Sequence, residues 1–102
     1  MSAESPIDLD RIDELIHGRL RLGVMAYLSG AGTAGFPELA DKLGATNGNL
    51  STHLTKLEEA GYVRQEKGYN GKRPQTLVHL TPEGREAWIA YLEAMRGVLG
   101  GV

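Results

Sequence analysis

The chain has 102 residues, a formal net charge of -2, 24% charged residues and no cysteine. This length suits a single domain, residues 1–102, and the lack of cysteine excludes disulfides, thiolate metal sites and cysteine nucleophiles. No apolar stretch approaches the length of a membrane span, and the acidic N-terminus lacks the apolar region of a signal peptide. We therefore expect a cytoplasmic protein without a membrane segment, and a frayed tail over residues 1–7.

The first half of the chain predicts three helices. Residues 9–16 carry apolar side chains at helical spacing, and a second such pattern spans residues 20–28. Thr33 is compatible with a short strand. Pro37 then belongs to the first turn of a short third helix, and Gly44 is its expected C-cap.

A fourth helix is predicted from about Asn47 to Ala60, with Thr46 as its N-cap. Leu50, Leu54 and Leu57 form a single apolar stripe, which predicts one buried face. A short helix, a tight turn and a longer helix with a polar start form a helix-turn-helix pattern.

The C-terminal part predicts a hairpin and a last helix. Two strands flank the Asn70-Gly71 dipeptide, which favours a tight turn with Lys72 and Arg73 near the tip. Thr81 provides the N-cap of the final helix, and Pro82 is its first residue.

Charge is distributed unevenly over these elements. Residues 1–43 carry four basic and seven acidic side chains, residues 44–80 carry five and three, and residues 81–102 carry two and three. The positive middle segment also contains most of a run of thirteen consecutive uncharged residues, from Leu43 to Thr55. Because local charge governs binding more than net charge does, this segment is the candidate binding region.

Two apolar stripes near the chain ends are candidates for a subunit interface, because a protein this small has too little core to hide both terminal helices. The candidate interface residues are Ile12, Leu15, Ile16, Trp88, Leu92, Met95 and Leu99. The last four are spaced by four, three and four residues, as in helix–helix seams. The alternative is that this seam packs entirely inside one subunit.

Three motifs occur in a particular order: "IHGRLRLGVMAYL", "NLSTHLTKLEEAGYV" and "KGYNGKRPQTLVHLTPEGREAW". With them, the chain resembles the winged helix-turn-helix transcription regulators of bacteria and archaea, near the MarR and ArsR families. The resemblance implies a mainly α fold with a small β-hairpin wing and N- and C-terminal dimerisation helices. It also implies a homodimer that regulates transcription by binding double-stranded DNA at a roughly palindromic site.

This resemblance explains the uncharged run. Side chains in a major groove exchange hydrogen bonds with base edges, whereas acidic groups there are repelled by phosphates. The candidate DNA-binding residues are Asn49, Ser51, Thr52, His53, Thr55 and Lys56 on the helix, and Lys72 and Arg73 on the wing. The two wing residues are expected at a phosphate or in the minor groove.

Alternatives remain at this stage. Thr, Asn and Ser are also favoured at helix starts, and His53 is compatible with a hydrogen bond inside the fold. A winged-helix module for protein–protein assembly is the alternative function. Such a module, however, has no need of Lys56, Lys72 and Arg73 around a neutral polar face.

Other functional classes lack support in the sequence. Three scattered histidines give no pair at metal-ligand spacing, so we expect neither a metal nor an ArsR-type metal site. No nucleophile elbow or phosphate-binding loop surrounds the Ser, His and Asp residues, so we expect no enzyme and no cofactor. A small-molecule effector is compatible with the resemblance, but no residue points to its site.

Overall fold

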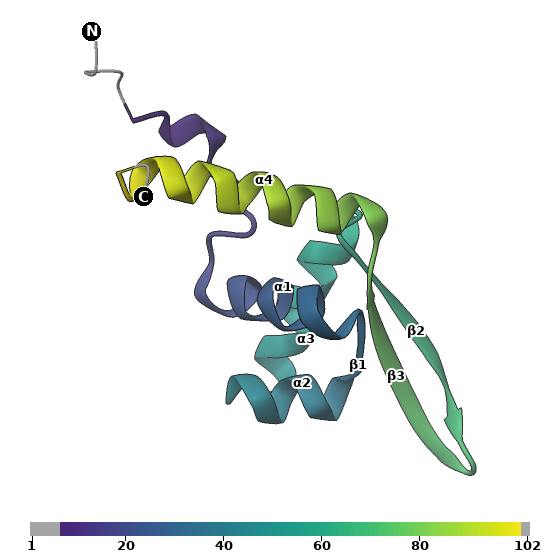
Figure 1. Ribbon diagram of the computed structural model, residues 1–102. Coiled ribbons are helices and arrows are strands. Elements are labelled where there is room, and N and C mark those ends of the chain that lie inside the picture. Colours follow the sequence, from purple (N-terminus) through teal and green to yellow (C-terminus); the bar gives the residue numbers. More distant parts are fainter. Residues whose placement is uncertain (1–6, 101–102) are drawn as a thin grey trace, which may run out of the picture.

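The computed structural model describes residues 7–100. Most of the predicted frayed tail, residues 1–6, therefore lies outside the described residues. In chain order the elements are a 3-10 helix (Leu9–Arg11), α1 (Arg19–Ala31), β1 (Thr33–Gly35), α2 (Phe36–Leu43), α3 (Asn47–Glu59), β2 (Val63–Asn70), β3 (Arg73–Leu80) and α4 (Pro82–Val98) (Figure 1). The predicted mainly α fold with a β-hairpin wing is confirmed.

The helices surround one hydrophobic core, and the strands contribute side chains to it. Figure 1 shows α1 in the middle of the helical body, with α4 across one side, α2 on the other and α3 behind. The completely buried side chains are Ile16, Val24, Met25, Leu28, Leu39, Leu50, Leu54, Leu57 and Val78. The predicted stripe of α3 is thus confirmed as its buried face, so the opposite side of α3 is left to solvent.

The sheet has the strand order β1-β3-β2 and is antiparallel throughout. Its base is buried at Ala34, Val63 and Val78. The β2–β3 pairing runs out to Asn70 opposite Arg73, and Gly71, at a φ of 67°, permits the tight turn between them. The outer half of this hairpin projects from the body as the wing (Figure 1).

The end of α3 and the start of α4 are joined through Thr81. Its backbone N–H donates to the Tyr62 carbonyl at 3.1 Å, and its hydroxyl donates to the Gly61 carbonyl at 2.5 Å. The same hydroxyl accepts from the Gly84 N–H at 2.9 Å, which confirms the predicted N-cap. A Cβ at Gly84 would lie 2.1 Å from the Tyr62 oxygen, so only glycine allows this approach.

The segment before α1 corrects the prediction of a first helix over residues 9–16. After the 3-10 helix, an Asp13 carboxylate oxygen accepts the backbone N–H groups of Leu15 and Ile16, at 2.9 and 3.3 Å. Its other oxygen accepts the Tyr62 hydroxyl at 2.5 Å. These bonds compete with helical hydrogen bonding, so the segment packs on the core as turns. The prediction of a helix over residues 9–16 was therefore wrong.

The predicted interface residues are divided between core and surface. Ile16 has no exposed surface, which corrects its assignment to a subunit interface, and Ile12 and Leu15 are partly buried against the core. Trp88 and Met95 also pack against the core of their own subunit, whereas Leu92 and Leu99 are 48% and 66% exposed.

The division has a simple geometric cause. The buried face of α4 is centred on Tyr91, which stacks on Trp88 at a ring distance of 5.7 Å. The predicted stripe runs along the border of that face, so alternate members turn inward and outward. The stripe therefore leaves only Leu92 and Leu99 free for a partner.

Within residues 7–100, no helix is both long and apolar enough to cross a bilayer.

Candidate nucleic-acid interface

The solvent side of α3 gathers five of the predicted DNA-binding residues. The Thr46 hydroxyl accepts the Asn49 N–H at 3.1 Å, as predicted for the N-cap, and this fixes the first turn. The predicted residues that are exposed along the helix are Asn49, Ser51, Thr52, Thr55 and Lys56. These five form a neutral polar face with a single positive charge, and the exposed acidic residues Glu58 and Glu59 follow at the C-terminal end of the helix.

The two threonines of this face are oriented by their own helix. The Thr52 hydroxyl donates to the Gly48 carbonyl and the Thr55 hydroxyl to the Ser51 carbonyl, each at 3.0 Å. Each hydroxyl donor is therefore occupied, while the oxygen lone pairs and the methyl group remain free. Such groups suit the amino groups of adenine and cytosine and the methyl group of thymine.

His53 is held at the edge of the same face. Its Nδ1 lies 2.8 Å from Arg21 Nη1, and because arginine can only donate, Nδ1 accepts and Nε2 carries the proton. Burial, followed by the charges of Arg21 and Lys56, lowers the pKa of His53 below its usual value. His53 thus makes the hydrogen bond inside the fold that the sequence left open, as a neutral side chain.

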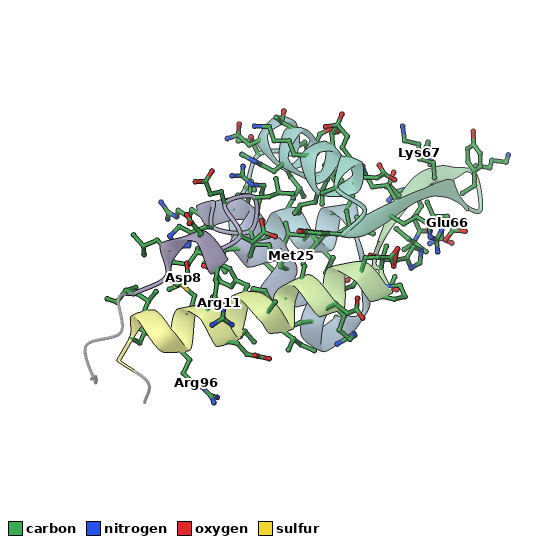
Figure 2. All side chains as sticks on the ribbon, turned by 90° about the horizontal axis from the view of Figure 1, so that it is seen from above. Asp8, Arg11, Met25, Glu66, Lys67 and Arg96 are labelled. Carbon is green, nitrogen blue, oxygen red and sulfur yellow. The ribbon has the colours of Figure 1, made fainter. Side chains whose placement is uncertain are left out.

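The wing separates its charges onto two faces. Lys67 points to the side on which α3 lies and Glu66 to the opposite side (Figure 2). Glu66 accepts from His79 Nε2 at 2.9 Å, and His79 Nδ1 also contacts the Thr33 hydroxyl at 2.8 Å. Lys67 was missed by sequence reasoning, although strand alternation is the signal that could have found it.

The tip of the wing carries the two predicted basic residues. Lys72 and Arg73 are exposed, and within residues 7–100 neither has a carboxylate within 4.0 Å. Tyr69, next to the tip, is 76% exposed. The structure therefore brings positive charge and an aromatic ring together at the end of the hairpin.

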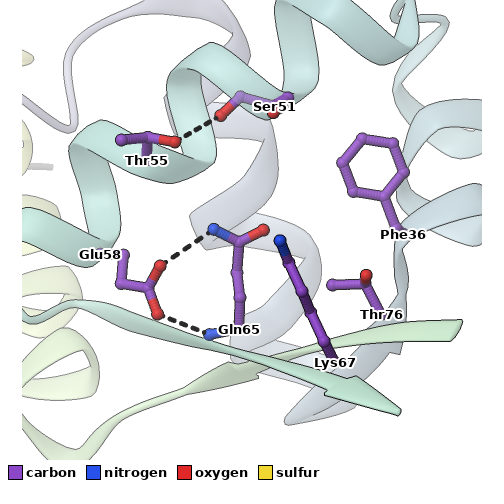
Figure 3. A pocket seen from close by; sticks show the side chains of 7 residues that line it. All are labelled: Phe36, Ser51, Thr55, Glu58, Gln65, Lys67 and Thr76. Atoms are coloured by element: carbon purple, nitrogen blue, oxygen red, sulfur yellow. Dashed lines mark hydrogen bonds between the residues drawn. The ribbon is translucent and has the colours of Figure 1, made fainter.

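A groove of about 700 Å³ separates α3 from the wing (Figure 3). At its base, the Glu58 carboxylate accepts both the backbone N–H and the side-chain amide of Gln65, each at 3.0 Å. This clamp ties the last turns of α3 to the first residues of β2. It links the helix to the wing at the base of the groove, and neither residue was singled out in the sequence.

Metal-binding geometry is absent from the described part of the chain. Among residues 7–100, no three His, Asp or Glu side chains gather where an ion could be held. His17 instead contacts the Tyr91 hydroxyl at 2.7 Å.

Comparisons with known proteins agree with this geometry. Residues 20–99 match the family described as "Winged helix DNA-binding domain". The chain is 35% identical over 79 residues to the uncharacterized protein MJ0432 of Methanocaldococcus jannaschii, covering 78% of this chain and 86% of that one.

Two solved structures are also similar. The transcriptional regulator homologue protein from Pyrococcus horikoshii OT3 has a TM-score of 0.81 and 31% identity, covering 87% of this chain and 88% of that one. A protein described as a transcriptional regulator of the MarR family, from Enterococcus faecalis V583, has a TM-score of 0.71 and 30% identity, covering 81% and 74%. The two solved proteins are thus described as transcriptional regulators, and this chain belongs to the winged helix DNA-binding domain family.

Proposed function

We propose that the protein is a homodimeric, sequence-specific transcription regulator that binds a roughly palindromic duplex site. One observation carries the proposal: the neutral polar face of α3 and the Lys67 face of the wing point to the same side of the molecule. In this arrangement α3 enters a major groove, and the wing reaches over the neighbouring backbone toward the minor groove.

The exposed side chains divide into two roles. Asn49, Thr52 and Thr55 read base edges, because they offer short polar groups and methyls without charge. Lys56, Lys67 and the tip residues Lys72 and Arg73 contact phosphates, which positions the helix without reading sequence. The clamp between Glu58 and Gln65 keeps both sets in one geometry.

An exposed apolar surface at the other end of the molecule supports the dimer. This terminal patch consists of Ile7, Leu9, Ile89, Leu92 and Leu99, which are 48 to 66% exposed. Figure 1 shows the N-terminal segment running beside α4. The radius of gyration is 15.7 Å against about 13 Å for a compact domain of this size, so the molecule is elongated.

A two-fold axis through the terminal patch would present two copies of α3 to successive major grooves. Each copy reads only a few base pairs, so pairing lengthens the site and makes it palindromic. In this arrangement the terminal patch, which is remote from the wing, lies clear of the DNA.

The test is binding to duplex DNA measured by fluorescence anisotropy across a salt series. We expect tight binding to sites selected from genomic fragments, with two half-sites about one helical turn apart and a steep salt dependence. Absent or salt-independent binding would favour the protein–protein module instead.

A further inference from the structure

A second cleft lies along α3, on the side away from the wing. It has a volume of about 520 Å³ and lies between the N-terminal end of α1, the α2–α3 turn and the first turns of α3. Arg19 and Arg21 line it together with Thr46, Asn49 and His53. None of its lining residues is acidic, in a chain with 13 acidic side chains.

Arg21 is held in this cleft by two hydrogen bonds. Its Nε donates to the Leu15 carbonyl at 2.5 Å, and its Nη1 donates to His53 Nδ1 at 2.8 Å. A Cβ on Gly18 would lie 2.4 Å from Nη2, so the glycine leaves the space that the guanidinium occupies. The side chain is therefore oriented before any ligand arrives.

The positive charge in the cleft has no counter-ion in the described chain. Among residues 7–100, no carboxylate lies within 4.0 Å of Arg19 or Arg21. Both acceptors of Arg21 are neutral groups, a carbonyl and an uncharged imidazole. An oriented guanidinium with free N–H groups and no anion is suited to a phosphate.

We infer that this cleft receives a backbone phosphate of the bound DNA, on the strand opposite the one that the wing approaches. The inference rests on the proposed function. A major groove about 12 Å wide has a sugar–phosphate backbone on each side, so a helix lying in it faces both strands. Lys67 and the wing flank α3 on one side, and Arg19 and Arg21 flank it on the other.

The test compares the salt dependence of DNA binding among full-length variants. Arg19→Ala and Arg21→Ala should each lower the log–log slope by about 0.9 for every phosphate that the variant no longer neutralises, counted over both subunits. Arg85→Ala is the matched control, because Arg85 is an exposed arginine on α4, remote from this cleft, and its removal should leave the slope unchanged. Thermal melting checks folding. If Arg21→Ala fails to fold, Arg19→Ala alone provides the test, because Arg19 is exposed.

A further variant moves the guanidinium without changing the net charge. Gly18 has a φ of -96°, which alanine also adopts, so Gly18→Ala should keep the fold but displace Arg21. We expect weaker binding and a lower slope than in the wild type. Wild-type slopes in both Arg19→Ala and Gly18→Ala would overturn the inference while leaving the proposed function intact. Failure of the wild-type protein to bind DNA would refute the proposed function, and the inference with it.

A titration with inorganic phosphate separates the backbone from a free anion. We expect no saturable shift of the melting temperature up to millimolar phosphate, because the cleft is completed by DNA. Saturable stabilisation by phosphate that Arg19→Ala abolishes, combined with an unchanged DNA salt slope, would assign the cleft to a free anion and contradict the inference.

Discussion

Replacing Leu92 by Glu should convert the proposed dimer into folded monomers. Leu92 and Ile89 are 48% and 50% exposed and Leu99 is 66% exposed, so each still has apolar surface to bury. Complete burial of such a side chain contributes about 1.5–3 kcal/mol, which scales to about 0.7–1.5 kcal/mol for Leu92 and Ile89 and about 1–2 kcal/mol for Leu99. In a two-fold symmetric interface each residue occurs twice, so the burial of these apolar side chains contributes about 5–10 kcal/mol before the costs of association.

The charged variant reverses this contribution. Leu92→Glu removes about 1.5–3 kcal/mol over the two copies and places two carboxylates in a closing interface. The dissociation constant of the dimer should rise at least about 100-fold, which corresponds to about 2.7 kcal/mol. The monomer should stay folded, because Leu92 lies outside the core cluster.

Light scattering across a concentration series measures the effect, with DNA affinity recorded on the same samples. Ala90→Glu is the matched control, since Ala90 is exposed on the opposite flank of α4 and outside the terminal patch. Monomeric wild type at tens of micromolar, or a Leu92→Glu variant that dimerises like Ala90→Glu, would refute the assignment of this surface.

Three further predictions concern the wing, the joint and the N-terminal segment. Replacing Lys72 and Arg73 together by Ala should weaken binding to all sequences alike and lower the salt slope by about 0.9 for each phosphate left without its cation, and an unchanged slope would remove the tip from the interface. Gly84→Ala should lower the unfolding free energy by about 1–3 kcal/mol or more in denaturant titrations, because its Cβ would meet the Tyr62 carbonyl at 2.1 Å; a neutral effect would contradict this packing. The hydrogen bond to Asp13 raises the pKa of Tyr62 to about 12. The stabilisation by this hydrogen bond is therefore fully present below pH 10 and is lost as pH rises from 10 through 12. Tyr62→Phe should be less stable than wild type at neutral pH, and the difference in stability should shrink over that pH range.

Local signals predicted most of the fold. Thr46 and Thr81 are N-caps, Gly44 ends a helix and Gly71 lies in the tight turn of the hairpin, as expected. Each of these signals acts within a few residues, so sequence spacing alone reveals it. The exposed face of α3 was also predicted from local spacing, because the position of a single apolar stripe determines which side of a helix faces solvent.

Long-range hydrogen bonds account for what the sequence did not predict. Residues 9–16 have helical apolar spacing, but Asp13 uses its carboxylate for local N–H groups and for Tyr62, which is 49 residues away. The clamp between Glu58 and Gln65 and the bond between Arg21 and His53 also join separate elements. Spacing along the chain contains no information about such partners, so Arg21 looked like an ordinary helical arginine.

The same interactions explain how an acidic chain can present a basic face. The chain has a net charge of -2, yet two of the three acidic residues in segment 44–80 are engaged in hydrogen bonds within the protein. Glu58 is engaged by the Gln65 amide groups, and Glu66 pairs with His79 on the far face of the wing. Lys67 and Arg21 have no such partner among residues 7–100. Because phosphates respond to the local field, the salt dependence of binding should reflect this face and not the net charge.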